Sequence, residues 1–236
     1  MIALPCRKCG STNIAKNGHT KAGTQKYYCK SCGFSGSLMT KDNERTQRRE
    51  LVEKLHLERV SQRGIARLLG ISRTTIIAML KKVIQPIAKT IEPLSSRPTL
   101  EFDQLWSYVG KKANKVWIWL AIERETRRIV GIAFGDRSDA TCRKLWASLP
   151  PDYRKRASIY TDYLESYANI VPSKRLHQVG KESGETAHIE RFNNTLRQRC
   201  ANLVRKTLSF SKDDLLHQIR VRLFIDDYNR TCTSQL

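Results

Sequence analysis

The sequence predicts an α/β fold for residues 99–236, preceded by a cysteine-bearing segment and a helical segment. Three observations support this division. Residues 99–236 alternate between short apolar runs and helical patterns, residues 1–40 carry two C-x-x-C pairs, and residues 41–84 contain short amphipathic helical runs. Three strands followed by alternating helices and strands are typical of a sheet that helices cover on both faces.

The strands of the larger part are predicted from near-continuous β-branched and aromatic runs, which are typical of strands buried on both faces. These runs cover residues 99–109, 115–123, 128–135, 157–161 and 175–179. Helical patterns cover residues 139–149, 163–170, 186–204 and 212–228. The first helical pattern ends at Pro150 and Pro151, where we expect the helix to stop.

A zinc ribbon is predicted over residues 1–40. Two C-x-x-C pairs, with 19 residues between them, are formed by Cys6 with Cys9 and by Cys29 with Cys32. Each pair can place two thiolates on one side of a tetrahedral Zn²⁺ ion. Gly10 and Gly33 follow the second cysteine of each pair, where a sharp turn favours a residue without a Cβ atom.

A helix-turn-helix DNA-binding segment is predicted within residues 41–84. A short helix begins near Gly64, Gly70 occupies a turn that needs positive φ, and Ser72 caps a second helix that runs to about Val83. Side chains near the start of such a second helix read base edges. The candidate DNA-binding residues are Arg73, Thr74, Thr75, Lys81 and Lys82. A generic helical hairpin is the alternative.

A linker is predicted at residues 85–98, between the helical segment and the α/β part. Pro86, Pro93 and Pro98 interrupt this stretch, together with a pair of serines. Proline removes a backbone donor and disfavours helix in the residue before it, so regular structure is not expected here.

Three carboxylates of the α/β part are candidate metal ligands. Asp103 lies inside the first apolar strand, where an unpaired carboxylate costs several kcal/mol. Asp162 follows the fourth strand, at the carboxyl end where open α/β sheets place ligands. Glu190 lies on a helix whose polar stripe continues through Asn193, Asn194 and Arg197. If the first and fourth strands are neighbours, the two aspartates converge and the helix can bring Glu190 to them.

Three carboxylates that meet in this way would hold two Mg²⁺ ions for an in-line phosphoryl transfer. Each residue also has an ordinary alternative. Asp103 could be a paired structural aspartate, Asp162 a turn residue and Glu190 a solvated helix residue.

Composition and charge narrow the class of protein. With 43 Lys and Arg against 22 Asp and Glu, the net charge is +21. This charge favours a protein that binds a polyanion such as nucleic acid over a protein that is basic without such a partner. A hydrophobic content of 40% is enough for packed cores. We expect no membrane span, no signal peptide and a cytoplasmic, DNA-associated protein. Four of the seven cysteines fall in the two C-x-x-C pairs, and Cys142, Cys200 and Cys232 are scattered, a pattern that favours metal binding in a reducing compartment over a disulfide framework.

Several segments together resemble one family. These are PCRKCGS and YYCKSCG, GISRTTI, EFDQLWSYVG, YTDY and HIERFNNTLRQRC. They are similar to the insertion-sequence-one family of bacterial transposases, and the resemblance covers nearly the whole chain. It implies a ribonuclease H-like catalytic domain, a mixed sheet flanked by helices, over residues 99–236.

The resemblance also implies an Asp-Asp-Glu (DDE) triad of Asp103, Asp162 and Glu190, with Arg197 as a basic residue seven positions after the glutamate. The expected cofactors are structural Zn²⁺ and two catalytic Mg²⁺ ions, for which Mn²⁺ can substitute. The expected partners are terminal inverted repeats, target DNA and further copies of the chain. Glu185 is the main competitor for the glutamate role, and Glu182 a weaker one.

Three rival functions differ in what they require. A DNA-binding regulator with a non-catalytic second domain would not need the three carboxylates to converge. A structure-specific nuclease of the same fold would cut DNA without rejoining it. A serine recombinase is disfavoured because its nucleophile domain usually occupies the N-terminal region, which is a cysteine-bearing segment here.

Overall fold

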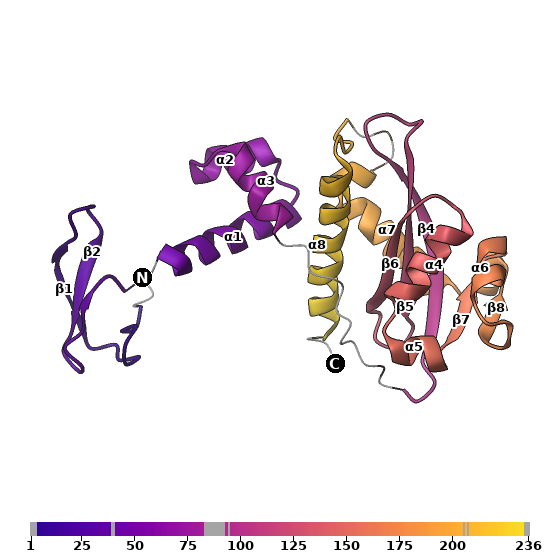
Figure 1. The fold of residues 1–236 in the computed structure, drawn as a ribbon, viewed down its shortest axis with the longest axis horizontal. Helices are drawn as coiled ribbons and strands as arrows, with labels where there is room; N and C mark the ends of the chain where they lie inside the picture. The colour runs from indigo at the N-terminus through magenta and orange to yellow at the C-terminus, as the bar shows by residue number, and fades with distance from the viewer. Residues whose placement is uncertain are drawn as a thin grey trace. The chain divides into compact units, whose positions relative to one another are not determined.

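The computed structural model describes residues 4–38, 41–82, 93, 95–204, 206 and 208–233. The chain divides into two compact units, residues 1–52 and 53–236 (Figure 1). Most of the predicted linker, and the predicted helix end at Val83, lie outside the described residues. None of the helices in the described ranges is long and apolar enough to cross a membrane.

The first unit contains a small antiparallel sheet. Its strands are β1 (Ile14–His19), β2 (Gln25–Cys29) and β3 (Ser35–Gly36), with β2 in the centre. Gly10 and Gly33 have φ values of 73° and 70°. Both lie in the left-handed region that glycine adopts without a steric penalty, so the two predicted cysteine turns are confirmed.

Three helices follow the small sheet: α1 (Lys41–Leu57), α2 (Gln62–Leu69) and α3 (Arg73–Lys81). Gly70 ends α2 with a φ of 63°, and its amide donates to the Ala66 carbonyl. The Ser72 hydroxyl caps α3 by accepting a hydrogen bond from the Thr75 amide at 3.0 Å. The predicted turn glycine and capping serine are therefore confirmed.

A five-stranded mixed sheet forms the centre of the second unit. Its strands are β4 (Thr99–Tyr108), β5 (Lys115–Glu123), β6 (Ile129–Gly135), β7 (Ser158–Thr161) and β8 (Leu176–Gln178). The order is β6-β5-β4-β7-β8. The β4–β5 and β5–β6 pairs are antiparallel, whereas β4–β7 and β7–β8 are parallel. The first and fourth predicted strands are thus neighbours, as the convergence of the two aspartates requires.

Helices cover both faces of this sheet (Figure 1). On one face lie α7 (Ala187–Arg199) and α8 (Asp214–Thr233), packed on Leu105, Ile118 and Leu120. On the other lie α4 (Asp139–Ser148), α5 (Pro151–Arg156) and α6 (Glu165–Ile170), packed on Phe102 and Trp119. Short 3-10 turns occupy Ser173–Arg175, Lys181–Ser183 and Ala201–Leu203.

The helix expected to stop at Pro150 and Pro151 does so, because α4 ends at Ser148 and Leu149 and Pro150 are not helical. Pro151 then begins a separate helix, α5, where its fixed φ and missing amide suit a helix start. The predicted end of another helix is wrong. The helix expected at 186–204 ends at Arg199, because Cys200 adopts an extended conformation before the 3-10 turn at Ala201–Leu203.

Candidate functional site

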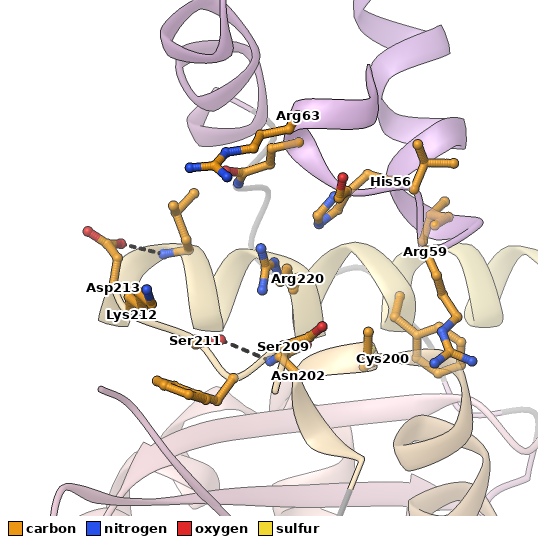
Figure 2. Close-up of a pocket in the computed structure, with 18 of the residues that line it drawn as sticks. His56, Arg59, Arg63, Cys200, Asn202, Ser209, Ser211, Lys212, Asp213 and Arg220 are labelled. Carbon is orange, nitrogen blue, oxygen red and sulfur yellow. Dashed lines mark hydrogen bonds between the residues drawn. The ribbon is translucent and has the colours of Figure 1, made fainter. Parts of the chain in front are cut away.

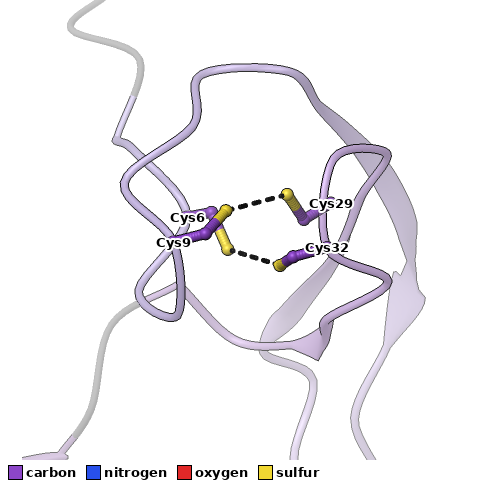
Figure 3. Close-up of side chains that lie close together, drawn as sticks. All are labelled: Cys6, Cys9, Cys29 and Cys32. Carbon is purple, nitrogen blue, oxygen red and sulfur yellow. Dashed lines mark hydrogen bonds between the residues drawn. The ribbon is translucent and has the colours of Figure 1, made fainter.

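The four N-terminal cysteines form a cluster that could hold a metal ion (Figure 3). The Sγ atoms of Cys6 and Cys32 lie 3.7 Å apart, and those of Cys9 and Cys29 lie 3.6 Å apart. All four Sγ atoms lie within 4.8 Å of one another. Tetrahedral zinc with Zn–S bonds of about 2.3 Å requires sulfur atoms roughly 3.8 Å apart. The spacing of the thiols therefore fits one tetrahedral ion.

Asp103 lies half-buried in β4, on the sheet face that α7 covers. Its Oδ1 accepts a hydrogen bond from the Gln104 amide at 2.8 Å, and its Oδ2 accepts one from Asn193 Nδ2 at 2.6 Å. Burial raises the pKa of Asp103 to about 6, and the charges of Asp162 and Glu190 add to this rise against the opposing hydrogen bonds. The carboxylate is therefore close enough to the other two to be affected by their charges.

Asp162 directly follows β7, at the carboxyl end of a strand that runs parallel to β4. Glu101 pairs with Tyr160 in this register, so Asp103 and Asp162 follow the paired positions by two residues each. Asp162 Oδ1 accepts from the Leu164 amide at 3.2 Å, and Oδ2 accepts from Gln104 Nε2 at 3.3 Å. Gln104 therefore links the two aspartates through its backbone amide and its side chain.

Glu190 lies in the first turn of α7 and is exposed. Its Oε1 accepts a hydrogen bond from the Thr186 hydroxyl at 3.1 Å. Within the described residues, only the four cysteines gather ligand atoms of three or more His, Cys, Asp or Glu side chains within 4.8 Å. The three carboxylates are therefore more widely spaced than the thiols, and Glu190 is the outermost of them by exposure.

Asn193 is a site residue that the sequence did not single out, although it belongs to the polar stripe of Glu190. It is buried, with 6% of its surface exposed, and it holds Asp103 through its amide nitrogen. Its Oδ1 and the Oε1 of Gln104 are both buried without a hydrogen-bond partner. Unpartnered acceptor oxygens beside two carboxylates form an oxygen-rich donor set of the kind that Mg²⁺ takes.

A second acidic cluster lies next to the site. Glu101 is fully buried; its Oε2 accepts from the amides of His188 and Ile189 at the start of α7, and its Oε1 accepts from Arg124. Arg124 also pairs with Glu185 at 2.9 Å. Both carboxylates are thus compensated by Arg124, and Glu101 fixes the helix that carries Glu190 and Asn193 to β4.

The other candidate residues lie outside the carboxylate site. Arg197 is half-buried, and its guanidinium donates to the Leu203 carbonyl at 3.3 Å. On α3, Arg73 Nε donates to Gln62 Oε1 at 3.2 Å, while the hydroxyls of Thr74 and Thr75 lie within hydrogen-bonding distance of Ser72. Arg73, Thr74, Thr75, Lys81 and Lys82 are all exposed.

Comparisons with known proteins identify the family. Residues 99–229 match the sequence model of the IS1 transposase family. Insertion element iso-IS1n protein InsB of Shigella dysenteriae is 38% identical over 128 residues, which are 54% of this chain and 94% of that protein. Insertion element IS1 4 protein InsB of Escherichia coli (strain K12) is 38% identical over 117 residues, which are 50% of this chain and 67% of that protein. The chain therefore belongs to the IS1 transposase family.

Proposed function

We propose that this chain is a DNA transposase that binds terminal inverted repeats, cuts DNA at them and joins the freed 3′-hydroxyl to target DNA. The observation that carries the proposal is the group of oxygen ligands near Asp103. It consists of Asp103 in β4, Asp162 directly after β7, Asn193, whose buried Oδ1 has no hydrogen-bond partner, and Glu190, whose charge affects Asp103. The strand order and the helices on both faces support a ribonuclease H-like catalytic domain over residues 99–236.

Asp103, Asp162 and Glu190 would hold Mg²⁺ in this mechanism, with Mn²⁺ as a possible substitute. Bound divalent ions supply charge stabilisation for the attacking and leaving oxygens of an in-line phosphoryl transfer. Asn193 orients Asp103 through a hydrogen bond, and the Leu164 amide orients Asp162. Glu190 is exposed, and its carboxylate accepts a hydrogen bond from Thr186 within the same turn of the helix. Its side chain would therefore turn toward Asp103 when a divalent ion binds.

The nucleophile in this proposal is water for cleavage and the DNA 3′-hydroxyl for strand transfer. No covalent protein intermediate is required. Because two DNA ends must be joined, we expect the working form to be a dimer or a higher oligomer of this chain.

The N-terminal part would recognise the DNA. We assign a structural zinc ribbon to residues 1–40, since four thiols are the ligand set of structural Zn²⁺, and a helix-turn-helix to residues 41–84. The left-handed Gly70 between α2 and α3, and the exposed face at the start of α3, support the second assignment. Residues 85–98 would then link DNA recognition to catalysis.

Arg73→Ala is expected to weaken binding to the terminal repeat by about 1–3 kcal/mol if Arg73 contacts a guanine with both guanidinium nitrogens. The measurement is fluorescence anisotropy with a terminal-repeat duplex and an unrelated duplex. An equal loss on both duplexes would reassign Arg73 to phosphate contacts. Thr74→Ala is a smaller change on the same exposed turn and serves for comparison.

Arg197→Lys is expected to retain more strand-transfer activity than Arg197→Ala, because lysine keeps the charge that would hold a DNA phosphate but loses the planar fork. Arg197 also donates to the Leu203 carbonyl, so the melting temperatures of both variants must be measured with the activity. Activity equal to that of the unchanged protein in both variants would leave Arg197 with a structural role alone.

A strand-transfer assay tests the proposed function. The purified chain is incubated with Mg²⁺, a labelled terminal-repeat duplex and a supercoiled plasmid, and joined products are expected. Binding without any cleavage would favour a DNA-binding regulator. Cleavage without joining would favour a nuclease of the same fold.

A further inference from the structure

A cavity of about 500 Å³ lies between residues 56–73 and residues 199–224, all of which belong to the second unit (Figure 2). One wall comes from the end of α1, the turn after it, and the starts of α2 and α3. The opposite wall comes from the end of α7, residues 209–213 and α8. None of the three catalytic carboxylates lines this cavity, so it is a separate site.

The cavity walls are strongly basic. Six cationic side chains line it: Arg59, Arg63, Arg73, Arg199, Lys212 and Arg220. Asp213 is the single acidic lining residue, and its Oδ1 already accepts a hydrogen bond from the Leu216 amide. Arg199 pairs with Glu58 at 3.3 Å on the surface. The remaining positive charge is not balanced by the walls themselves.

Arg220 is the central feature of this cavity. It rises from α8 between the two walls, with Arg63 and His56 on the helical-segment side (Figure 2). Its Nε atom is buried and has no hydrogen-bond partner, and no ion pair of Arg220 is found among the described residues. Burial lowers the pKa of Arg220, and the charge of Arg73 lowers it further against an opposing contribution from Cys200. A half-buried guanidinium whose Nε has no acceptor is costly to desolvate, which favours an anion that completes the site.

His56 shows the same lack of a partner. Its Nδ1 is buried without a hydrogen bond, and burial together with the charge of Arg220 lowers its pKa to about 4. At neutral pH it is therefore an uncharged side chain that can donate to an anion from the wall opposite α8. Donors thus face the cavity from both sides.

We infer that this cavity binds a backbone phosphate of DNA, which Arg220 contacts from α8 and Arg63 from α2. The inference rests on the proposed function, since it takes DNA to be the polyanion that the chain binds. Guanidinium groups match phosphate oxygens with paired hydrogen bonds. Because one wall belongs to the helices that would recognise DNA and the other to the catalytic domain, a strand held here would contact both.

The test compares Arg220→Met with Arg230→Met, a variant of the same helix that makes the same charge change outside the cavity. Arg230 is exposed and pairs with Asp227 at 3.7 Å. Affinity for a terminal-repeat duplex and for an unrelated duplex is measured by anisotropy over a series of salt concentrations. Arg220→Met is expected to bind both duplexes roughly tenfold more weakly, the effect of one charge-assisted hydrogen bond.

The salt dependence identifies the contact. Loss of one phosphate contact should reduce the slope of log K against log salt by about 0.9, whereas Arg230→Met should leave the slope unchanged. Arg220→Lys should restore most of the slope. Should Arg220→Met lose its folded structure, Arg63→Met, an exposed change on the opposite wall, provides the same measurement.

The remaining outcomes separate this inference from the proposed function. If the unchanged protein binds neither duplex, the proposed function fails. If it binds them and Arg220→Met binds with the same affinity and slope, the phosphate site is overturned while the proposed function stands. If inorganic phosphate raises the melting temperature only when Arg220 is present, and duplex affinity does not depend on Arg220, the cavity is a small-anion site and the assignment to DNA is wrong.

Discussion

Asp103→Asn, Asp162→Asn and Glu190→Gln are each expected to abolish Mg²⁺-dependent cleavage and strand transfer while terminal-repeat binding survives. In the proposed mechanism each substitution would remove a charged ligand for the divalent ions, whose charge stabilisation would contribute several kcal/mol, roughly a thousandfold or more in rate. The measurement is the strand-transfer assay, with anisotropy to follow binding. If all three variants still cut DNA, the proposed mechanism fails.

Glu185→Gln is the matched control for Glu190→Gln, and it is expected to leave activity largely intact. The Glu185 carboxylate pairs with Arg124 at 2.9 Å, and glutamine can still accept that hydrogen bond. An inactive Glu185→Gln together with an active Glu190→Gln would transfer the glutamate role to Glu185.

The free energy of unfolding distinguishes the loss of a metal ligand from the loss of the folded structure. Burial raises the pKa of Asp103 from 3.8 to about 6, so its charge destabilises the metal-free folded state above about pH 6. This cost disappears as the pH falls from 6 toward 3.8, because the folded state then binds a proton that the unfolded state does not. Asp103→Asn should therefore raise the free energy of unfolding at pH 8 by up to about 3 kcal/mol, and by less at pH 4.5. Urea denaturation without divalent ions measures this, and a large loss of stability at pH 8 would contradict it.

Removal of the metal from the four-cysteine cluster is expected to unfold the first 38 residues and to abolish specific DNA binding. Structural Zn²⁺ contributes about 10–16 kcal/mol of binding free energy in small zinc domains, and the short three-stranded sheet has little buried core of its own. Metal analysis should find one Zn²⁺ per chain, and chelation should reduce the β signal in circular dichroism.

Cys29→Ser is expected to lose the zinc, since Cys29 is fully buried and its sulfur lies 3.6 Å from that of Cys9. Cys232→Ser changes a cysteine outside the cluster and should keep one zinc per chain. Protein that is purified without chelator and contains no metal would contradict the zinc assignment. A zinc content that Cys29→Ser leaves unchanged would also contradict it.

The strands were predictable because their signal is local. The run from Val116 to Ile122 is continuous in apolar residues, and the strand predicted at 115–123 matches β5 at both ends. Gly70 and Ser72 were predictable for the same reason, since turn and cap chemistry depends on single residues. The end of α4 before Pro150 and Pro151 was predictable too, because proline disfavours helix in the residue before it. That Pro151 begins a further helix depends on the structure that follows.

The parts of the site that depend on packing could not be read from spacing. Glu101 and Asp103 lie two residues apart in β4 and face the same side of the sheet. One is neutralised by Arg124, which lies beyond the end of β5, while the other meets Asn193 of α7. Both pairings require the sheet register and the position of α7. The lack of partners for the amide oxygens of Gln104 and Asn193 likewise appears only when the side chains are placed.

A crystal of the protein soaked in Mn²⁺ tests the central claim most directly, because manganese can be located by its anomalous scattering. We expect an anomalous peak between Asp103 and Asp162, near the coordination distance of about 2.1 Å that Mg²⁺ takes, with Glu190 turned toward it. Asp162→Asn should remove the peak. A peak at the Glu101–Glu185 cluster instead, or none near Asp103 in a crystal with Mn²⁺ bound elsewhere, would contradict the account.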